Sequence, residues 1–349
     1  MTTTLPRPHA PAAARRLRPP RRRAGAWVLG AVAALGAVVV LSLLVGANPV
    51  PPGDIWAALR GAGTATAQLV VDQRVPRTLA GLAVGAALGV AGALMQAATR
   101  NALADPGLLG VNAGAAVAVA VGIAFLGVTA PVGYMGLACA GALVAASTVH
   151  LLGGAADPRA APGRLVVTGV AVGAVLAGLT TGITLTHPDT FDRMRGWSAG
   201  SLLERGPQVL LPVLPLLVVG LVLAAGVARS LNAVALGPDV AHAQGVDVRR
   251  TRVLVLAAIT LLAGGATAVA GPITFVGLMV PHVVRWVVGT DQRRVLAGSL
   301  VAGCVLVVAS DVIGRIAVPP GEMPVGVVTA FVGAPVLIAL ARRRRAAAL

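Results

Sequence analysis

Long apolar runs alternate with short polar loops along almost the whole chain. Ten runs can be marked, at 27–46, 78–98, 107–130, 132–153, 165–186, 209–228, 253–272, 274–289, 295–316 and 323–341. Most are close to the length of about 20 residues with which an α-helix crosses the hydrocarbon core of a bilayer. A membrane β-barrel would instead show alternating segments of about ten residues. The pattern predicts an all-α membrane protein with ten transmembrane helices.

The composition agrees with this prediction. Hydrophobic residues make up 57% of the chain and charged residues 11%, and the mean hydropathy is +0.87. A soluble domain with so few charged residues could not cover its surface with polar groups. The composition therefore excludes a globular cytosolic enzyme.

The positive charge of the chain carries further information. The formal net charge is +16, and all 28 basic residues are arginines. Since a Walker P-loop needs a lysine to reach the nucleotide phosphates, the chain has no P-loop of its own. Ten spans with the N-terminus inside place most arginines in cytoplasmic loops, as the positive-inside rule requires. This topology accounts for the charge without nucleic acid as a partner and predicts that both termini are cytoplasmic.

The eighth run, 274–289, is the shortest and contains Arg285. If it did not cross the membrane, the arginine cluster at 342–345 would lie outside, against the positive-inside rule. The rule therefore favours ten spans.

The two ends of the chain are expected to lie outside the bilayer. Residues 1–25 are rich in Pro, Arg and Ala, which predicts a disordered basic tail held near anionic membrane lipid. The run at 27–46 could also be a signal peptide, but it is longer than the usual apolar region of about 7–15 residues, so a retained first helix is favoured. The transmembrane domain is then 26–343, and 344–349 form a short cytoplasmic tail.

Residues suited to catalysis or metal binding are sparse. Cys139 and Cys304 both lie inside apolar runs, and no histidine has a second ligand at metal-binding spacing. We expect no metal site and no catalytic residue. An intramembrane enzyme would need paired aspartates or an HExxH motif. An ion-coupled secondary transporter would need carboxylates in mid-membrane, where only Asp311 comes near.

Gly81, Gly85 and Gly89 lie four residues apart in the second run and so share one helix face. Such a stripe lets another helix approach closely. With 44 glycines in the chain, packing within the subunit is favoured over a seam between two subunits.

Several motifs are more specific than composition. They occur at 74–80 (RVPRTLA), 92–96 (GALMQ), 99–106 (TRNALADP), 108–114 (LLGVNAG), 197–202 (WSAGSL), 231–237 (LNAVALG), 271–282 (GPITFVGLMVPH), 323–329 (MPVGVVT) and 333–335 (GAP). In this order, over residues 27–343, they resemble the permease subunits of ABC importers for iron–siderophore complexes and vitamin B12, the FecCD-type family. Ala102, where that family usually has proline, and Gln244, where it usually has leucine, depart from the pattern.

The resemblance implies the architecture of a type II ABC importer permease, with ten transmembrane helices per subunit. It implies a second permease subunit, identical or related, two ATP-binding subunits that hydrolyse the ATP, and an external substrate-binding lipoprotein. The chain itself is then a transport subunit of the bacterial inner membrane, with no bound cofactor and no enzymatic activity of its own.

Three arginines at the outer mouth resemble the residues that receive acidic side chains from the binding protein in this family: Arg74, Arg77 and Arg315. A guanidinium is always charged and can bind a carboxylate through two hydrogen bonds. The residues alone also allow other interpretations. These arginines could anchor helices at the headgroup level, and Arg315 could pair with Asp311 one turn earlier.

Residues 236–245 (LGPDVAHAQG) begin with turn residues and continue as a short helical stretch that Gly245 could end. Within the segment 231–250 they resemble the coupling helix that contacts the ATPase subunit. The resemblance assigns this contact to Leu236, Gly237, Val240, Ala241, Ala243 and Gly245. Without it, an amphipathic surface loop would be the default interpretation.

Thr180, Thr181 and Thr184 cluster in the run at 165–186, which in the FecCD-type family faces the two-fold axis. They are assigned to the translocation path, although each hydroxyl could instead bond to its own helix. The expected function is import of a ferric siderophore by alternating access. Vitamin B12 and haem are alternative cargoes.

Overall fold

The computed structural model describes residues 21–46, 50–153, 162–203, 205–319 and 321–346. Over these residues the chain folds into helices and contains no strand, so the all-α prediction is confirmed. Each predicted run contains one apolar helix. Seven helices are long and apolar enough to cross a membrane: α1 (Arg21–Leu44), α3 (Ala65–Thr99), α5 (Pro131–Leu152), α6 (Pro162–Thr186), α8 (Pro207–Ala235), α10 (Val248–Ala270) and α12 (Gln292–Ala317).

Three further runs contain shorter apolar helical stretches. These are α4 (Val111–Leu126), α11 (Val276–Val288) and α13 (Val325–Ala346), whose apolar part is Val325–Ala339. The third run is shortened because Gly110 takes a left-handed conformation (φ 74°) and separates α4 from a preceding 3₁₀ helix, η1 (Pro106–Leu109).

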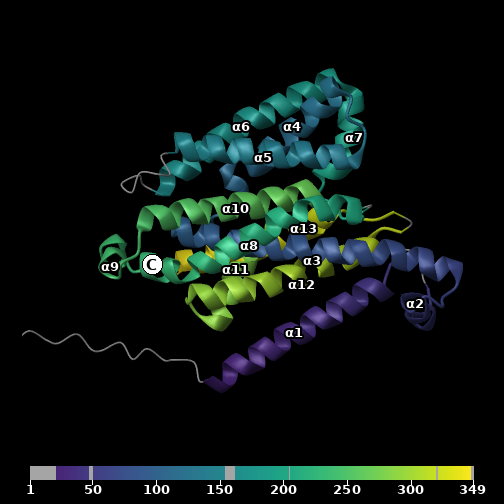
Figure 1. The fold of residues 1–349 in the computed structure, drawn as a ribbon, viewed down its shortest axis with the longest axis horizontal. Coiled ribbons are helices and arrows are strands. Elements are labelled where there is room, and N and C mark those ends of the chain that lie inside the picture. Colours follow the sequence, from purple (N-terminus) through teal and green to yellow (C-terminus); the bar gives the residue numbers. More distant parts are fainter. Residues whose placement is uncertain (1–20, 47–49, 154–161, 204, 320, 347–349) are drawn as a thin grey trace, which may run out of the picture.

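Three short helices lie in the segments between the runs: α2 (Pro52–Leu59), α7 (Pro188–Ser198) and α9 (Pro238–Ala243). Each begins with a proline, whose fixed φ suits the first turn of a helix and whose missing N–H is not needed there. The sequence predicted α9 but not α2 or α7. In Figure 1, α2 and α7 lie at one end of the molecule, while α9, the start of α1 and the end of α13 lie at the other.

Several boundaries differ from the predicted ones. Residues 21–25, assigned to the disordered tail, form the start of α1, and residues 1–20 lie outside the described part of the chain. At the other end, α13 continues through Ala346 into the predicted tail, and 347–349 also lie outside the described residues. Basic residues are good helix formers, so the helices continue past the apolar runs.

The second run is extended most. α3 has 35 residues and begins at Ala65, where Thr64 caps it by accepting a hydrogen bond from the Ala67 N–H (3.2 Å). At about 1.5 Å per residue it is about 52 Å long, against about 30 Å for the hydrocarbon core. Polar residues such as Asp72 interrupt the apolar pattern but not the helix. Arg74 and Arg77 therefore lie on a helix and not in a loop.

The two central helices are α3 and α10. In their most apolar windows, 83% of the α3 residues and 78% of the α10 residues are buried, against 6% in both α1 and α6. α3 packs against α12, α10 and α11. Figure 1 shows α4, α5 and α6 on one side of this centre and α1 along the opposite edge.

The glycine stripe of α3 packs against α12. A Cβ atom at Gly85 would lie 2.5 Å from the carbonyl oxygen of Gly303, and one at Gly89 would overlap the carbonyl oxygen of Ser299. These distances are shorter than any van der Waals contact, so only glycine allows the two backbones to approach this closely. The stripe is a packing surface within the subunit, as favoured from the sequence.

Gly85→Val is expected to destabilise the protein, because its side chain would collide with the α12 backbone. Overpacking costs about 1–3 kcal/mol even where side chains can move, and a backbone cannot move as easily. The measurement is the thermal melting temperature of the purified protein in detergent. Gly36→Val in α1 is the matched control, since a Cβ there meets no atom within 4 Å. Equal melting temperatures for the two variants would contradict this account.

Candidate functional site

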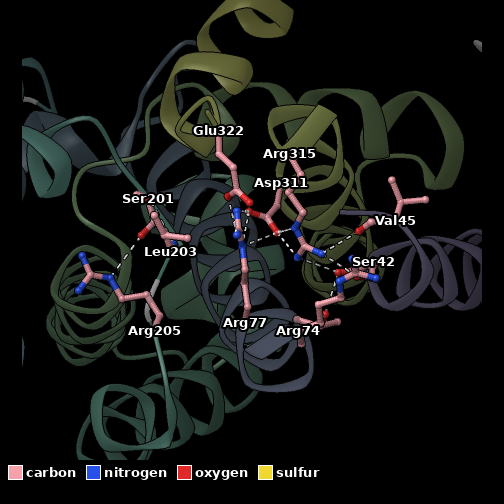
Figure 2. A network of polar contacts seen from close by, with 11 residues as sticks. Ser42, Val45, Arg74, Arg77, Ser201, Leu203, Arg205, Asp311, Arg315 and Glu322 are labelled. Carbon is pink, nitrogen blue, oxygen red and sulfur yellow. Dashed lines mark hydrogen bonds and ion pairs between the residues drawn. The ribbon is translucent and has the colours of Figure 1, made fainter. Parts of the chain in front are cut away.

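A cluster of charged side chains lies at the end of the molecule that carries α2 and α7 (Figure 2). α3 supplies Arg74 and Arg77, which are three residues apart and therefore lie on one face. α12 supplies Asp311 and Arg315, four residues apart and again on one face. Glu322 joins the cluster from the loop between α12 and α13. The structure thus brings the three predicted arginines together.

Asp311 is the centre of this cluster. It is 1% exposed and binds two guanidinium groups. Arg77 donates from Nη2 to Oδ1 (2.7 Å) and from Nε to both carboxylate oxygens (3.0 and 3.1 Å). Arg315 donates from Nε to Oδ2 (3.0 Å), and its Nη2 forms a second, short ion pair with the same oxygen. A buried carboxylate is stable only when it is paired in this way.

The remaining donors of Arg315 and Arg74 bind the end of α1. Arg315 donates from Nη1 to the carbonyl oxygens of Ser42 (2.6 Å) and Val45 (3.2 Å). Arg74 donates from Nη1 to the carbonyl oxygens of Leu43 (2.8 Å) and Leu44 (3.1 Å). The last carbonyls of a helix have no partner within it and carry a partial negative charge, so guanidinium groups are well suited to cap them. The cluster therefore attaches α1 to α3 and α12.

Arg77 is the predicted arginine that keeps some contact with solvent. Its side chain is 11% exposed, and its Nη1 donates to Oε2 of Glu322 (2.6 Å), whose side chain is 22% exposed. Arg74 and Arg315 are buried. Figure 2 shows Arg77 between Asp311 and Glu322, with Arg74 and Arg315 on the side of α1.

The pairing of Arg315 with Asp311, which the sequence left open as an alternative, is present in the structure. The contacts of Asp311 with Arg77 and of Glu322 with Arg77 were not predicted. The sequence did single out Asp311, because it is a carboxylate within an apolar run. Glu322 gave none, because its partner is far away in the sequence.

At the opposite end of the molecule, α9 forms a compact turn between α8 and α10. Gly237 (φ 118°) precedes the helix and Gly245 (φ 74°) follows it, both in conformations that favour glycine. The N–H of Val246 donates to the carbonyl of Ala241 and the N–H of Gly245 to that of His242, both at 2.9 Å. This pair of hydrogen bonds is a Schellman motif, so Gly245 ends α9 as predicted.

The predicted coupling residues have different positions around α9. Ala241 is buried and packs with Ala233 of α8 and Val248 of α10, which fixes α9 against the helices on either side. Of the others, Gly237 is half-buried and four are exposed: Leu236, Val240, Ala243 and Gly245. The first three of these present apolar side chains to the surface. Small and apolar side chains on a short, fixed helix can fit closely into a groove of another protein.

The predicted path residues lie on α6, one of the least buried helices. Thr180 donates its hydroxyl hydrogen to the carbonyl of Leu176 (2.9 Å), Thr181 to that of Ala177 (3.0 Å) and Thr184 to that of Thr180 (3.0 Å). The alternative of bonding to their own helix is therefore present. Each oxygen keeps lone pairs that can accept a further hydrogen bond, so the path assignment stays a prediction.

Among the described residues, no group of three or more His, Cys, Asp or Glu side chains could hold a metal ion. The charged side chains that the structure brings together form one arginine–carboxylate cluster: Arg74, Arg77, Asp311, Arg315 and Glu322.

Asp311→Asn is expected to lower stability strongly, because it leaves two arginines beside a neutral amide. Removing one partner of a buried ion pair costs about 3–5 kcal/mol. The measurement is thermal melting of the purified protein in detergent. Asp72→Asn on the exposed side of α3 is the matched control and should melt like the wild type. If Asp311→Asn melts at the same temperature as this control, the carboxylate does not hold α3 and α12 together.

Comparison with known proteins gives consistent matches over nearly the whole chain. The sequence profile of the FecCD transport family matches residues 34–343. The ferric enterobactin transport system permease protein FepD of Escherichia coli (strain K12) is 50% identical over 306 residues, which cover 87% of this chain and 91% of FepD. The vitamin B12 import system permease protein BtuC of Vibrio cholerae serotype O1 is 37% identical over 305 residues, which cover 86% of this chain and 89% of BtuC.

The fold also matches a solved structure. A metal-chelate type ABC transporter in an inward-facing conformation aligns with a TM-score of 0.81 at 24% sequence identity, covering 91% of this chain and 99% of that chain. This match supports an ABC permease fold, and the seven long apolar helices make the chain a multi-pass membrane protein. The profile match includes the arginine–carboxylate cluster and α9. The chain belongs to the FecCD transport family.

Proposed function

We propose that this protein is the membrane-spanning permease subunit of an ATP-driven importer and that its cargo is a ferric siderophore. The identity of 50% to the ferric enterobactin permease carries the choice of cargo, because the vitamin B12 permease of Vibrio cholerae and the ferric dicitrate permease FecD of E. coli reach only 37% and 38%. ATP is hydrolysed by separate subunits, since the chain has no lysine for a P-loop.

The proposed topology has ten spans with both ends of the chain in the cytoplasm. The three shorter apolar helices supplement the seven long ones to give this number. Short spans are tolerated because neighbouring helices cover their ends. With α9 and both described ends of the chain at one end of the molecule (Figure 1), the positive-inside rule makes that end cytoplasmic.

The second permease subunit is proposed to cover α6 and α13. The most apolar window of α6 is only 6% buried, and Phe331 of α13 is 72% exposed. A cavity of about 650 Å³ beside α13 is lined by Ser198 at the end of α7, Thr274 in the loop between α10 and α11, and Phe331 of α13. An apolar surface next to such a cavity is suited to a subunit contact that encloses a transport path. Thr180, Thr181 and Thr184 lie on the α6 part of this surface.

The exposed surface of α9 is proposed to contact an ATP-binding subunit. Leu236, Val240 and Ala243 form the contact, while Ala241, Gly237 and Gly245 fix its shape. Because α9 directly joins α8 and α10, a displacement of α9 moves two spans at once. This connection would convert closure of the ATPase subunits into alternating access.

The arginine–carboxylate cluster is proposed to lie on the outer side of the membrane and to receive the binding protein. Arg77 would make the direct contact, because it is more exposed than Arg74 and Arg315. Arg74 and Arg315 would position the end of α1. A carboxylate of the binding protein must then replace Glu322 at Arg77, and Glu322 therefore weakens docking while it keeps the buried charge paired in the absence of the partner.

The proposed cargo is tested by uptake of radiolabelled iron in a strain that lacks this gene. The wild-type gene should restore uptake of a ferric siderophore but not uptake of vitamin B12. The same uptake assay tests the proposed contact of α9 with the ATP-binding subunit. Val240→Glu should insert normally but fail to restore uptake, because a charge in an apolar contact is costly. Asp239→Asn on the same short helix is the matched control and should restore it. Restored uptake of vitamin B12 alone would refute the siderophore assignment.

Docking is tested by the affinity of the loaded binding protein for the purified importer in lipid nanodiscs. Arg77→Gln should weaken binding by about tenfold, or about 1.4 kcal/mol. Glu322→Gln should strengthen it, because the competing carboxylate is gone. Arg60→Gln, at the exposed arginine directly after α2, is the control and should change little. If Glu322→Gln weakens binding as Arg77→Gln does, the pair is structural and does not dock the partner.

A further inference from the structure

A groove opens between α8 and α12. None of its lining residues belongs to the arginine–carboxylate cluster or to α9. Its volume is about 660 Å³. Its walls come from α8 and α12, and Val90 of α3 lies at its base. Apart from two arginines, the lining is made only of Val, Leu, Ala and Gly: Val90, Leu221, Ala224, Ala225, Gly226, Ala228, Leu296, Ala297 and Leu300.

The two arginines lie at the same end of this groove. Arg229 is near the end of α8 and Arg293 is in the first turn of the antiparallel α12, and both are exposed. Among the residues that the structure describes, neither guanidinium forms an ion pair with a carboxylate. The nearby carboxylate of Asp291 binds the side-chain amide of Asn232 (3.1 Å) and the backbone N–H of Arg293 (3.0 Å). In the proposed topology this end is at the level of the cytoplasmic headgroups.

The rest of the groove is apolar and unfilled. Leu221 and Leu300 lie about 10–12 Å from the arginines along the helices, at about 1.5 Å per residue. A Cβ atom at Gly226 would meet no atom within 4 Å, so the wall has room there. Beside the groove, α8 exposes Val218, Val219 and Val222, which in a membrane protein would face lipid.

We propose that this groove binds one anionic glycerophospholipid of the cytoplasmic leaflet. Its phosphate lies between Arg229 and Arg293, and one acyl chain follows the apolar wall towards Leu221 and Leu300. Guanidinium groups bind phosphate oxygens bidentately, and basic pockets between spans at the cytoplasmic side suit acidic headgroups. Free phosphate would leave the apolar wall empty, whereas a lipid matches both parts of the groove.

Because of the position of the groove, a bound lipid would also affect the movement of the coupling surface. α8 continues into α9 through Leu236 and Gly237, so a lipid that joins α8 to α12 restrains the helix that carries the coupling surface. This consequence rests on the proposed function, whereas lipid binding itself needs neither cargo nor ATP.

The test is native mass spectrometry of the complete transporter, titrated in detergent with phosphatidylglycerol or phosphatidylcholine. The wild type should bind one phosphatidylglycerol in preference to phosphatidylcholine. Arg229→Gln with Arg293→Gln should lower the affinity for phosphatidylglycerol by about tenfold to thirtyfold. Gly226→Leu should lower it as well, although both arginines remain, because its side chain occupies the space of the acyl chain.

The matched control is Arg249→Gln with Arg250→Gln, two exposed arginines at the same end that do not line the groove. It should bind phosphatidylglycerol like the wild type, and thermal melting should show that every variant is folded. An equal loss in the control would overturn the proposal, since binding would then follow net charge alone. It would also be overturned if Gly226→Leu kept its lipid but separated the two permease subunits, because the groove would then be a subunit contact. Iron uptake in cells tests the proposed function separately.

Discussion

The carboxylate of Asp311 lies almost completely buried near the C-terminal end of α12 and forms ion pairs with guanidinium groups from α3 and α12. A buried charge must be neutralised, and this requirement fixes the surroundings. α3 must be helical through Arg77, just before its apolar run, so that the guanidinium reaches Asp311. Arg315 must lie one turn further along α12, and its spare donors then bind the carbonyls at the end of α1. The ion pairs of Asp311 thus join α3 to α12, and the remaining donors of Arg315 join α12 to the end of α1.

α3 connects this arginine–carboxylate cluster with the opposite end of the molecule. Near its middle, Gly85 and Gly89 allow it to pack directly against the backbone of α12. Past its last turn, Arg100 donates a hydrogen bond to the carbonyl of Val234 (2.6 Å), close to the end of α8 and the start of α9. In the proposed importer, α3 is therefore the continuous helix that connects the docking surface with the coupling surface.

Much of the fold could be predicted from the sequence because its signals are local. Each apolar run contains a helix, Gly245 ends α9, and the stripe of Gly81, Gly85 and Gly89 packs within the subunit. The short helices α2 and α7 were missed, since their apolar positions are few and their main signal is a single proline. Helix ends were missed where charged residues continue a helix, as in the first turns of α3.

The sequence by itself determined the class of protein, the number of apolar segments and the family resemblance, since all three follow from composition, periodicity and motifs along the chain. Only the tertiary structure decided which groups Arg74, Arg77 and Arg315 bind. Arg77 meets Glu322 and Asp311 across more than two hundred residues, and Arg74 binds carbonyls of α1. The groove of Arg229 and Arg293 likewise exists only because α8 and α12 pack side by side. Such contacts depend on how helices pack, and packing is set by side chains that lie far apart in the sequence.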